Sequence, residues 1–242
     1  MYEISQEYKD KLNQRGIVKK GYLNLINNSK ITKYTESDIK SFTILDDIYT
    51  PDEGIVGSVI AKQIEGYLFK APNTTLIDKE IEAYIGVSGE EEYIPMGRFI
   101  IQKPEDNKIT DKAYFIGLDY MVKFNLSYED KLVYPCALKD VLEAICEQCE
   151  VTLGSTSFTN DNFIVENNQF VAGESCRDVL SAICQIAGCY AKIGRDNKLY
   201  LLLTNNTDEK FLPSDYTPSS FEMNNVFGEV NRVVIKMSGV EG

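Results

Sequence analysis

Polar and apolar residues alternate along much of the first half of the chain, and the clearest example is Lys79–Val87. There one face carries apolar residues and the other polar ones: Ile81, Ala83, Ile85 and Val87 face one way, and Glu80, Glu82 and Tyr84 face the other. A period of two is typical of a strand with one buried face. The same pattern, with turn residues between segments, predicts further strands at Ile17–Ile26, Ile31–Tyr34, Ser41–Leu45, Ser58–Phe69, Tyr93–Gln102 and Ala113–Leu118. Strands that recur in this way favour a small barrel or sandwich, preceded here by a short amphipathic helix at Ile4–Leu12.

The period changes near Asp119, where apolar residues begin to recur at helical spacing. Two stripes predict helices at Leu138–Cys149 and Cys176–Ala187, and both contain the string Asp-Val-Leu-x-Ala-Ile-Cys. Ser175 with Asp178 predicts a capping box for the second helix, whereas Ala137 is a poor cap for the first. Short strands are expected after the helices, at Val151–Leu153, Tyr190–Ile193 and Lys198–Thr204, the last two as a hairpin.

These patterns predict an α+β chain that is mainly β. We expect a β-barrel domain at 1–125, a small α/β domain with a helix-strand repeat at 126–204, and a connection at 205–242. The connection carries one more predicted strand, Val230–Met237. We expect this strand either to begin a second barrel in a longer chain or to pair back onto the first barrel.

Composition narrows the classes of function. The chain contains no histidine, which excludes Ser-His-Asp triads, Cys-His pairs and His-ligated metal sites. A carboxylate pair or a lysine is what remains for catalysis, and neither can be selected from the sequence. We therefore predict a structural or binding protein that is not an enzyme, and we assign no catalytic, cofactor-binding or metal-binding residue and no cofactor.

The charge balance bears on the partners. The formal net charge is −12, and basic residues are scattered along the chain. This argues against sequence-specific nucleic-acid binding, although an acidic wall would let DNA slide past without adhering. Solubility alone is an equally good reason for the charge. The polar N-terminus and the lack of a long apolar run predict no signal peptide and no membrane segment, so the six cysteines are expected to stay reduced in a cytoplasm.

Three local features are candidates for binding sites. Cys146 and Cys149, with Cys184 and Cys189 downstream, have a spacing that can bind zinc, but their helical positions favour core packing. Acidic residues at 46–47 and 52–53 lack the spacing of a calcium loop, and the run at 89–92 is expected at a hairpin tip. The fifteen tyrosines are expected to pack within strands, with a carbohydrate-stacking face as the alternative.

Five stretches share linear patterns with one known family: Ser41–Lys62, Tyr93–Pro104, Gly117–Phe124, Tyr134–Leu142 and Ala191–Tyr200. On these residues the chain resembles the hub proteins of phage tails and baseplates in Gram-positive hosts, including the N-terminal part of tail-associated lysins and tail endopeptidases. The resemblance covers most of the chain and includes no catalytic signature.

The resemblance implies a structural hub that forms a homotrimeric ring beneath the tail tube. Such a hub joins the tube to a central spike or fibre, lines the DNA path and contacts tube and distal tail proteins. It is made in the bacterial cytoplasm and resides in the virion tail. The alternatives are an anchor or part of a peptidoglycan-degrading tail enzyme, or a carbohydrate-binding receptor module.

Overall fold

The computed structural model describes residues 5–12, 18–28, 30–47, 55–70, 72, 75–107, 112–168 and 173–203. The chain divides into two units, Met1–Thr204 and Asn205–Gly242. The second unit lies outside the described residues, and with it the predicted strand Val230–Met237. The boundary expected between barrel and α/β domain stays a prediction.

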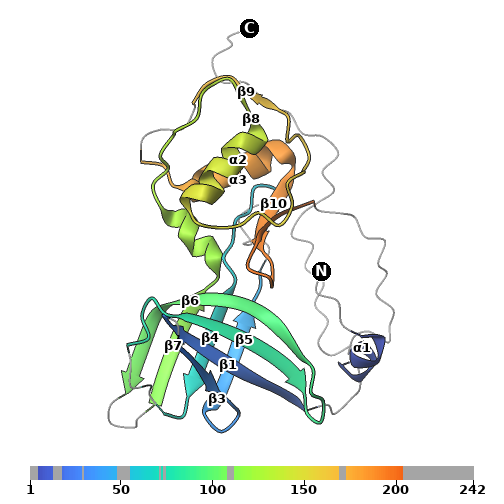
Figure 1. The fold of residues 1–242 in the computed structure, drawn as a ribbon, viewed down its shortest axis with the longest axis vertical. Coiled ribbons are helices and arrows are strands. Elements are labelled where there is room, and N and C mark those ends of the chain that lie inside the picture. Colours follow the sequence, from blue (N-terminus) through green and yellow to red (C-terminus); the bar gives the residue numbers. More distant parts are fainter. Residues whose placement is uncertain are drawn as a thin grey trace, which may run out of the picture. The chain divides into compact units, whose positions relative to one another are not determined.

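Seven antiparallel strands form one sheet in the first unit (Figure 1). They are β1 (Lys19–Asn27), β2 (Lys30–Tyr34), β3 (Ile39–Leu45), β4 (Gln63–Leu68), β5 (Glu80–Val87), β6 (Tyr93–Asn107) and β7 (Lys112–Leu118). Their order across the sheet is β2-β1-β5-β6-β7-β4-β3. β2 and β3 therefore form opposite edges, although only the turn Thr35–Asp38 separates them along the chain.

This sheet is curled, because the inner face of β1 meets a side chain from the far edge. A methyl group added at Gly21 of β1 would lie only 2.7 Å from the Phe42 ring of β3. Since β1 and β3 are not neighbours in the sheet, such an approach requires strong curvature. No pairing joins β2 to β3 among the residues described, so closure into a barrel stays a prediction.

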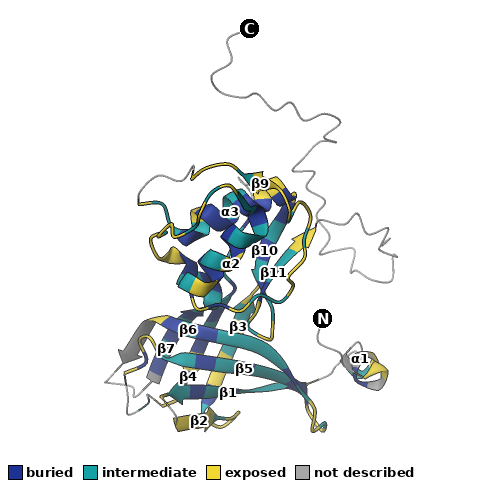
Figure 2. Cartoon of the chain, turned by 45° about the horizontal axis from the view of Figure 1, so that its top comes forward, coloured by how far each residue is buried: buried dark blue, intermediate teal, exposed yellow. Residues whose placement is uncertain are grey.

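Alternation along the strands produces the core on the inner face of the sheet (Figure 2). In β4 and in β5 as far as Tyr84, buried positions alternate with half-buried or exposed ones, as the sequence pattern predicts. After the register shift between Ala83 and Tyr84 the alternation is lost, because Ile85 is half-buried while Gly86 and Val87 are buried. The buried residues of this sheet core are Leu23, Leu25, Ile39, Ile64, Leu68, Leu76, Ile81, Ala83, Phe99, Ile101, Ala113 and Phe115. Helix α1 (Gln6–Leu12) places Tyr8 in a separate small cluster with Val87 and Ile94, and Lys11 pairs with Glu90 at 2.7 Å.

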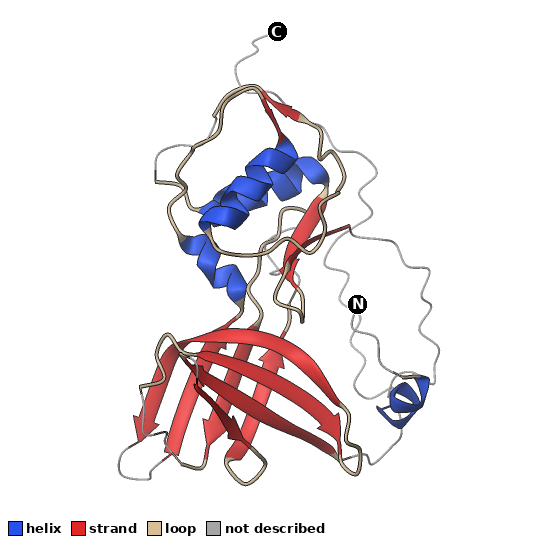
Figure 3. Ribbon diagram, viewed as in Figure 1, coloured by secondary structure: helices blue, strands red, loops and turns tan. Residues whose placement is uncertain are grey.

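An α/β region, Tyr120–Leu203, follows the sheet (Figure 3). It contains the 3₁₀ helix η1 (Tyr120–Asn125), helices α2 (Leu138–Gln148) and α3 (Cys176–Ala187), the short strands β8 (Cys136–Ala137) and β9 (Ile164–Val165), and a hairpin of β10 (Cys189–Ile193) and β11 (Leu199–Leu203). Both predicted helices and the hairpin are confirmed. Among the described residues, no helix is long and apolar enough to span a membrane.

The two related helices begin differently, as their sequences predict. In α3, Ser175 Oγ accepts a hydrogen bond from Asp178 N at 3.2 Å, and the Asp178 carboxylate accepts one from Ser175 N at 2.9 Å. In α2 only the second half of this box exists, because Ala137 has no side-chain acceptor; its N–H donates to Asp140 at 2.9 Å. α3 ends at Gly188, whose φ of 66° is left-handed.

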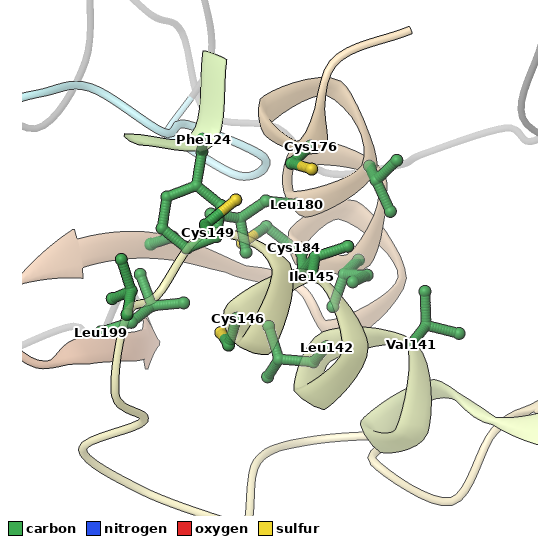
Figure 4. Packing of buried hydrophobic residues seen from close by; sticks show 14 of the residues in the cluster. Phe124, Val141, Leu142, Ile145, Cys146, Cys149, Cys176, Leu180, Cys184 and Leu199 are labelled. Carbon is green, nitrogen blue, oxygen red and sulfur yellow. The ribbon is translucent and has the colours of Figure 1, made fainter. Parts of the chain in front are cut away.

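The helices pack on each other and on the hairpin around one core (Figure 4). Side chains of α2, α3 and η1 converge there, with Phe124, Ile145 and Leu180 fully buried. Five of the six cysteines are buried in this cluster: Cys146, Cys149, Cys176, Cys184 and Cys189. At these positions the thiols pack as small apolar groups.

Three strand predictions need correction. The predicted strand Ser58–Phe69 begins only at Gln63, because its first part leaves the sheet and runs beside β10. The predicted strand Val151–Leu153 is reduced to one parallel bridge between Leu153 and Leu199. The strand predicted at Tyr93–Gln102 continues to Asn107 along β7.

Candidate functional site

Apart from the passage that leaves β3 through Asp46 and Asp47, the described chain passes between the sheet and the α/β region at two adjacent places, which together we call the junction. One is Gly57–Lys62, which leads into β4, and the other is Leu118–Met121, where β7 gives way to η1. They are adjacent because Gln63 pairs with Leu118 in the sheet. One backbone hydrogen bond joins the two places: the N–H of Asp119 donates to the carbonyl oxygen of Lys62 at 2.9 Å.

The first crossing also acts as a partner strand for the hairpin of the α/β region. Gly57 N donates to Cys189 O at 2.8 Å, and Ala191 N donates to Ser58 O at 2.9 Å. Ser181 of α3 adds a side-chain bond, from its hydroxyl to Gly57 O at 2.8 Å. These bonds fix the crossing to the α/β region rather than to the sheet.

Three charged residues meet at the junction. Lys62 and Asp119 are only 4% and 2% exposed. Asp119 Oδ1 accepts from Met121 N at 3.0 Å and so caps η1, while its buried Oδ2 has no protein partner. Arg177 of α3 donates from Nη2 to Met121 O at 3.0 Å, and its buried Nε also lacks a protein partner. Lys62 Nζ makes a long bond, 3.5 Å, to Ile193 O.

Burial dominates the electrostatics of this cluster. It raises the pKa of Asp119 from the ordinary 3.8 to about 6, although backbone hydrogen bonds and the Lys62 cation act in the opposite direction. Burial lowers the pKa of Lys62, which Asp46 and Asp119 counteract. It likewise lowers the pKa of Arg177. Lys62 and Asp119 are therefore poorly solvated charges, whereas Arg177 is half-buried and only its Nε is shielded from water.

Two further polar contacts connect the sheet with the hairpin of the α/β region. Asp46, after β3, pairs with Lys192 of β10 at 2.9 Å. The backbone N–H of Arg98 in β6 donates to Asn197 Oδ1, in the β10–β11 turn, at 2.7 Å. These contacts are accessible to water at their edges, so each contributes modestly to stability.

A groove of about 590 Å³ lies beside the junction. Residues 56–61 form one side, and Arg177, Asp178, Ser181 and Gln185 of α3 form the other. Its lining combines apolar side chains from residues 56–61 with one cation, one anion and neutral polar groups, which identifies no particular ligand chemistry.

The outer face of the sheet carries a group of tyrosines that pack against one another. Tyr22 of β1 stacks on Tyr84 of β5 with ring centroids 4.5 Å apart, and Tyr93 approaches edge-on at 4.8 Å. From the opposite neighbour of β1, Lys33 places its ammonium 3.8 Å from the Tyr22 ring centroid. Both faces of Tyr22 are thus covered, which supports packing rather than sugar stacking at this position.

The two edge strands offer backbone groups for assembly. β2 and β3 each have one side without a strand partner among the residues described. Ile31 on β2 and Leu45 on β3 are 61% and 44% exposed. Lysines on both edges, including Lys30 and Lys40, oppose indiscriminate strand pairing while leaving room for a specific partner.

Of the other sequence candidates, Cys189 accepts a hydrogen bond from Gly57 of the junction through its backbone and Asp46 acts on Lys62 and Asp119, while the rest lie elsewhere. Cys146 and Cys149 are in the α/β core, and no group of three or more Cys, Asp or Glu residues suited to a metal occurs in the described part of the chain. The acidic run at 89–92 joins β5 to β6, as predicted for a hairpin tip. Asp46 pairs with Lys192, whereas Asp52 and Glu53 lie outside the described residues.

Sequence reasoning missed the junction. Lys62 and Asp119 are distant in sequence, and lysine and aspartate are normally expected at the surface. One signal was available for Asp119, which precedes the apolar Tyr120–Phe124 as an N-cap residue would. For Lys62 no comparable signal exists.

Comparisons with known proteins find similarity in structure but not in sequence family. No protein-family model matches the sequence, and no curated protein matches it. A tail protein from Neisseria meningitidis MC58 superposes with a TM-score of 0.51 at 13% identity, over 76% of this chain and 50% of that protein. The 43 kDa tail protein of prophage MuSo2 from Shewanella oneidensis gives 0.50 at 11% identity, over 77% of this chain and 56% of that protein.

At such low identity the likeness concerns the fold. The chain spans about half the length of these solved tail proteins. The superposed region covers about three quarters of this chain. The chain therefore shares the fold of these two tail proteins, one of which belongs to a prophage.

Proposed function

We propose that this protein is a structural hub of a phage tail or phage-tail-like particle, located in the virion tail. The observation that carries the proposal is the likeness of the fold to two solved phage tail proteins, over about three quarters of this chain. The linear patterns at Ser41–Lys62 and Tyr93–Pro104 point the same way. In this role the protein joins the tail tube to a central spike or fibre.

Assembly into a homotrimer is consistent with the surfaces described above. A ring requires heterologous contacts, in which one surface of a subunit meets a different surface of the next. The open edges of β2 and β3 are two such different surfaces on one sheet. The net charge of −12 suits a lumen that DNA must cross without binding.

Light scattering of the purified full chain tests the proposal. The molar mass is measured for the chain alone and again with tail-tube and distal-tail proteins from the same particle. A trimer in either condition is the expected result. A monomer that binds none of these proteins would contradict the hub role.

We further propose that the protein has no catalytic activity of its own. The absence of histidine from the whole sequence supports this. Incubation with purified peptidoglycan checks it, and release of soluble fragments would instead favour a cell-wall-degrading role. Binding on a glycan array would favour the receptor alternative.

A further inference from the structure

We propose that the junction is a hinge, and that it opens by admitting water to the cluster formed by the buried Lys62 and Asp119 and the half-buried Arg177. The open state solvates these three charges, whereas the closed state leaves two of their polar atoms without a protein partner. This inference concerns motion within the chain and does not depend on the proposed assembly role.

The way in which the two regions are connected supports a hinge. The sheet core and the α/β core are separate hydrophobic clusters that share no residue. The described contacts between them at the hairpin are polar, Asp46 with Lys192 and Arg98 N with Asn197. Polar contacts can be exchanged for water at small cost, unlike apolar packing. Relative motion is thus resisted mainly by the junction itself.

The hydrogen bonding of the cluster explains why the closed state of the hinge is readily opened by water. Asp119 Oδ2 and Arg177 Nε are buried without a protein partner, and Lys62 Nζ has the 3.5 Å bond to Ile193 O. Each of these groups would gain hydrogen bonds if water reached it. Opening therefore restores hydration that burial removed, and this gain offsets part of the cost of breaking the hydrogen bonds at the junction.

Several charged groups act on the cluster. Asp119 interacts with Lys62 and Asp46; Lys62 also interacts with Lys192 and Arg195 of the hairpin; Arg177 interacts with Asp119 and Asp178. Asp119 titrates close to neutrality, since burial raises its pKa to about 6. Its closed-state pKa exceeds its ordinary value of 3.8, so the closed hinge binds a proton more tightly than the open one. Opening releases that proton and becomes easier as the pH rises from about 4 through about 6.

Hydrogen exchange with mass spectrometry tests this on the full chain. Protection is measured in peptides covering 57–62 and 118–122, at about pH 5 and about pH 7, with correction for the intrinsic exchange rate. The Asp119 carboxyl has a pKa of about 6 in the closed hinge and 3.8 in the open, solvated one. Opening of the wild-type hinge should therefore become about tenfold more frequent between about pH 5 and about pH 7. Asp119→Asn should lose this dependence and open less often than wild type at about pH 7.

Glu91→Gln is the matched control, because it makes the same carboxyl-to-amide change on the exposed hairpin tip and should behave as wild type. If Asp119→Asn fails to fold, as judged by circular dichroism, Lys62→Met replaces it. Loss of the Lys62 cation should shift the titration of opening to higher pH, since that cation lowers the pKa of Asp119. Equal pH dependence in wild type and Asp119→Asn, faster opening in Asp119→Asn, or an unshifted titration in Lys62→Met would overturn the proposal.

Discussion

Substitution of Gly21 by alanine tests whether the sheet is curled. The added methyl group would lie 2.7 Å from Cε1 and Cζ of Phe42 and 2.8 Å from the backbone oxygen of Tyr84. Non-bonded carbon atoms prefer about 3.5–4.0 Å, so the Phe42 ring would have to withdraw by about 1 Å within a closely packed interior. The Tyr84 carbonyl belongs to β5, which is paired with β1, and cannot withdraw without disturbing that ladder.

Overpacking of this kind costs about 1–3 kcal/mol, and the smaller entropy of the unfolded alanine chain offsets about 0.4–1 kcal/mol. We therefore expect Gly21→Ala to lower the free energy of unfolding by about 1–2 kcal/mol. Urea unfolding followed by far-UV circular dichroism measures this difference. The result reports on the curvature of the sheet, because Phe42 of the edge strand β3 reaches Gly21 of β1 only when the sheet is strongly curved.

Phe42→Leu provides the control, since the shorter side chain gives the new methyl group more room. The double variant should be more stable than the sum of the single effects predicts, by at least about 0.5 kcal/mol. A Gly21→Ala variant as stable as the wild type would refute the reasoning. Strict additivity in the double variant would show that Phe42 does not pack on β1.

Three further predictions concern the α/β region. Ser175→Ala should lower the free energy of unfolding by about 1 kcal/mol, while Ala137→Ser should raise it by supplying the absent cap, both measured by urea unfolding. Hydrogen bonds from Ser175 hold the pKa of Asp178 below its usual value. The ionised Asp178 carboxylate therefore stabilises the fold above about pH 4, and this contribution is lost as the pH falls through the lowered pKa. In acid-unfolding curves, Ser175→Ala should show a smaller loss of stability over this pH range than the wild type. In the native protein, a thiol reagent should react fastest at Cys136, which alone among the six cysteines is not buried. After unfolding in urea, all six should react. Equal reaction rates at several cysteines of the native protein would contradict the packing described above.

The sequence was most informative where local periodicity and burial agree. Helix α3 follows from its apolar stripe and the Ser175 cap, and β5 follows from the alternation at Lys79–Val87, which burial obeys as far as Tyr84. In both elements one face lies in a core, so the pattern of a few neighbouring residues reports the environment directly.

Prediction was least accurate where one segment serves two regions. The stretch at 58–62 is apolar and β-prone, yet it pairs with β10 before the chain enters the sheet at Gln63. Its hydrogen-bond partners come from residues far along the chain, which no local pattern encodes. The same is true of Lys62 and Asp119, whose burial depends on the meeting of two distant crossings.

The strand order described above has a consequence for synthesis of the protein on the ribosome. β1 must wait for β5, and β4 must wait for β7, so the sheet cannot become continuous until the nascent chain has emerged as far as Leu118. Until then the early hairpin β1–β2 and the pair β3–β4 expose unpaired flanks and the apolar residues of the future core. Such non-local pairing gives a high contact order, which slows folding and prolongs exposure to aggregation. Efficient production is therefore expected to depend on chaperones that shield these first hairpins during translation.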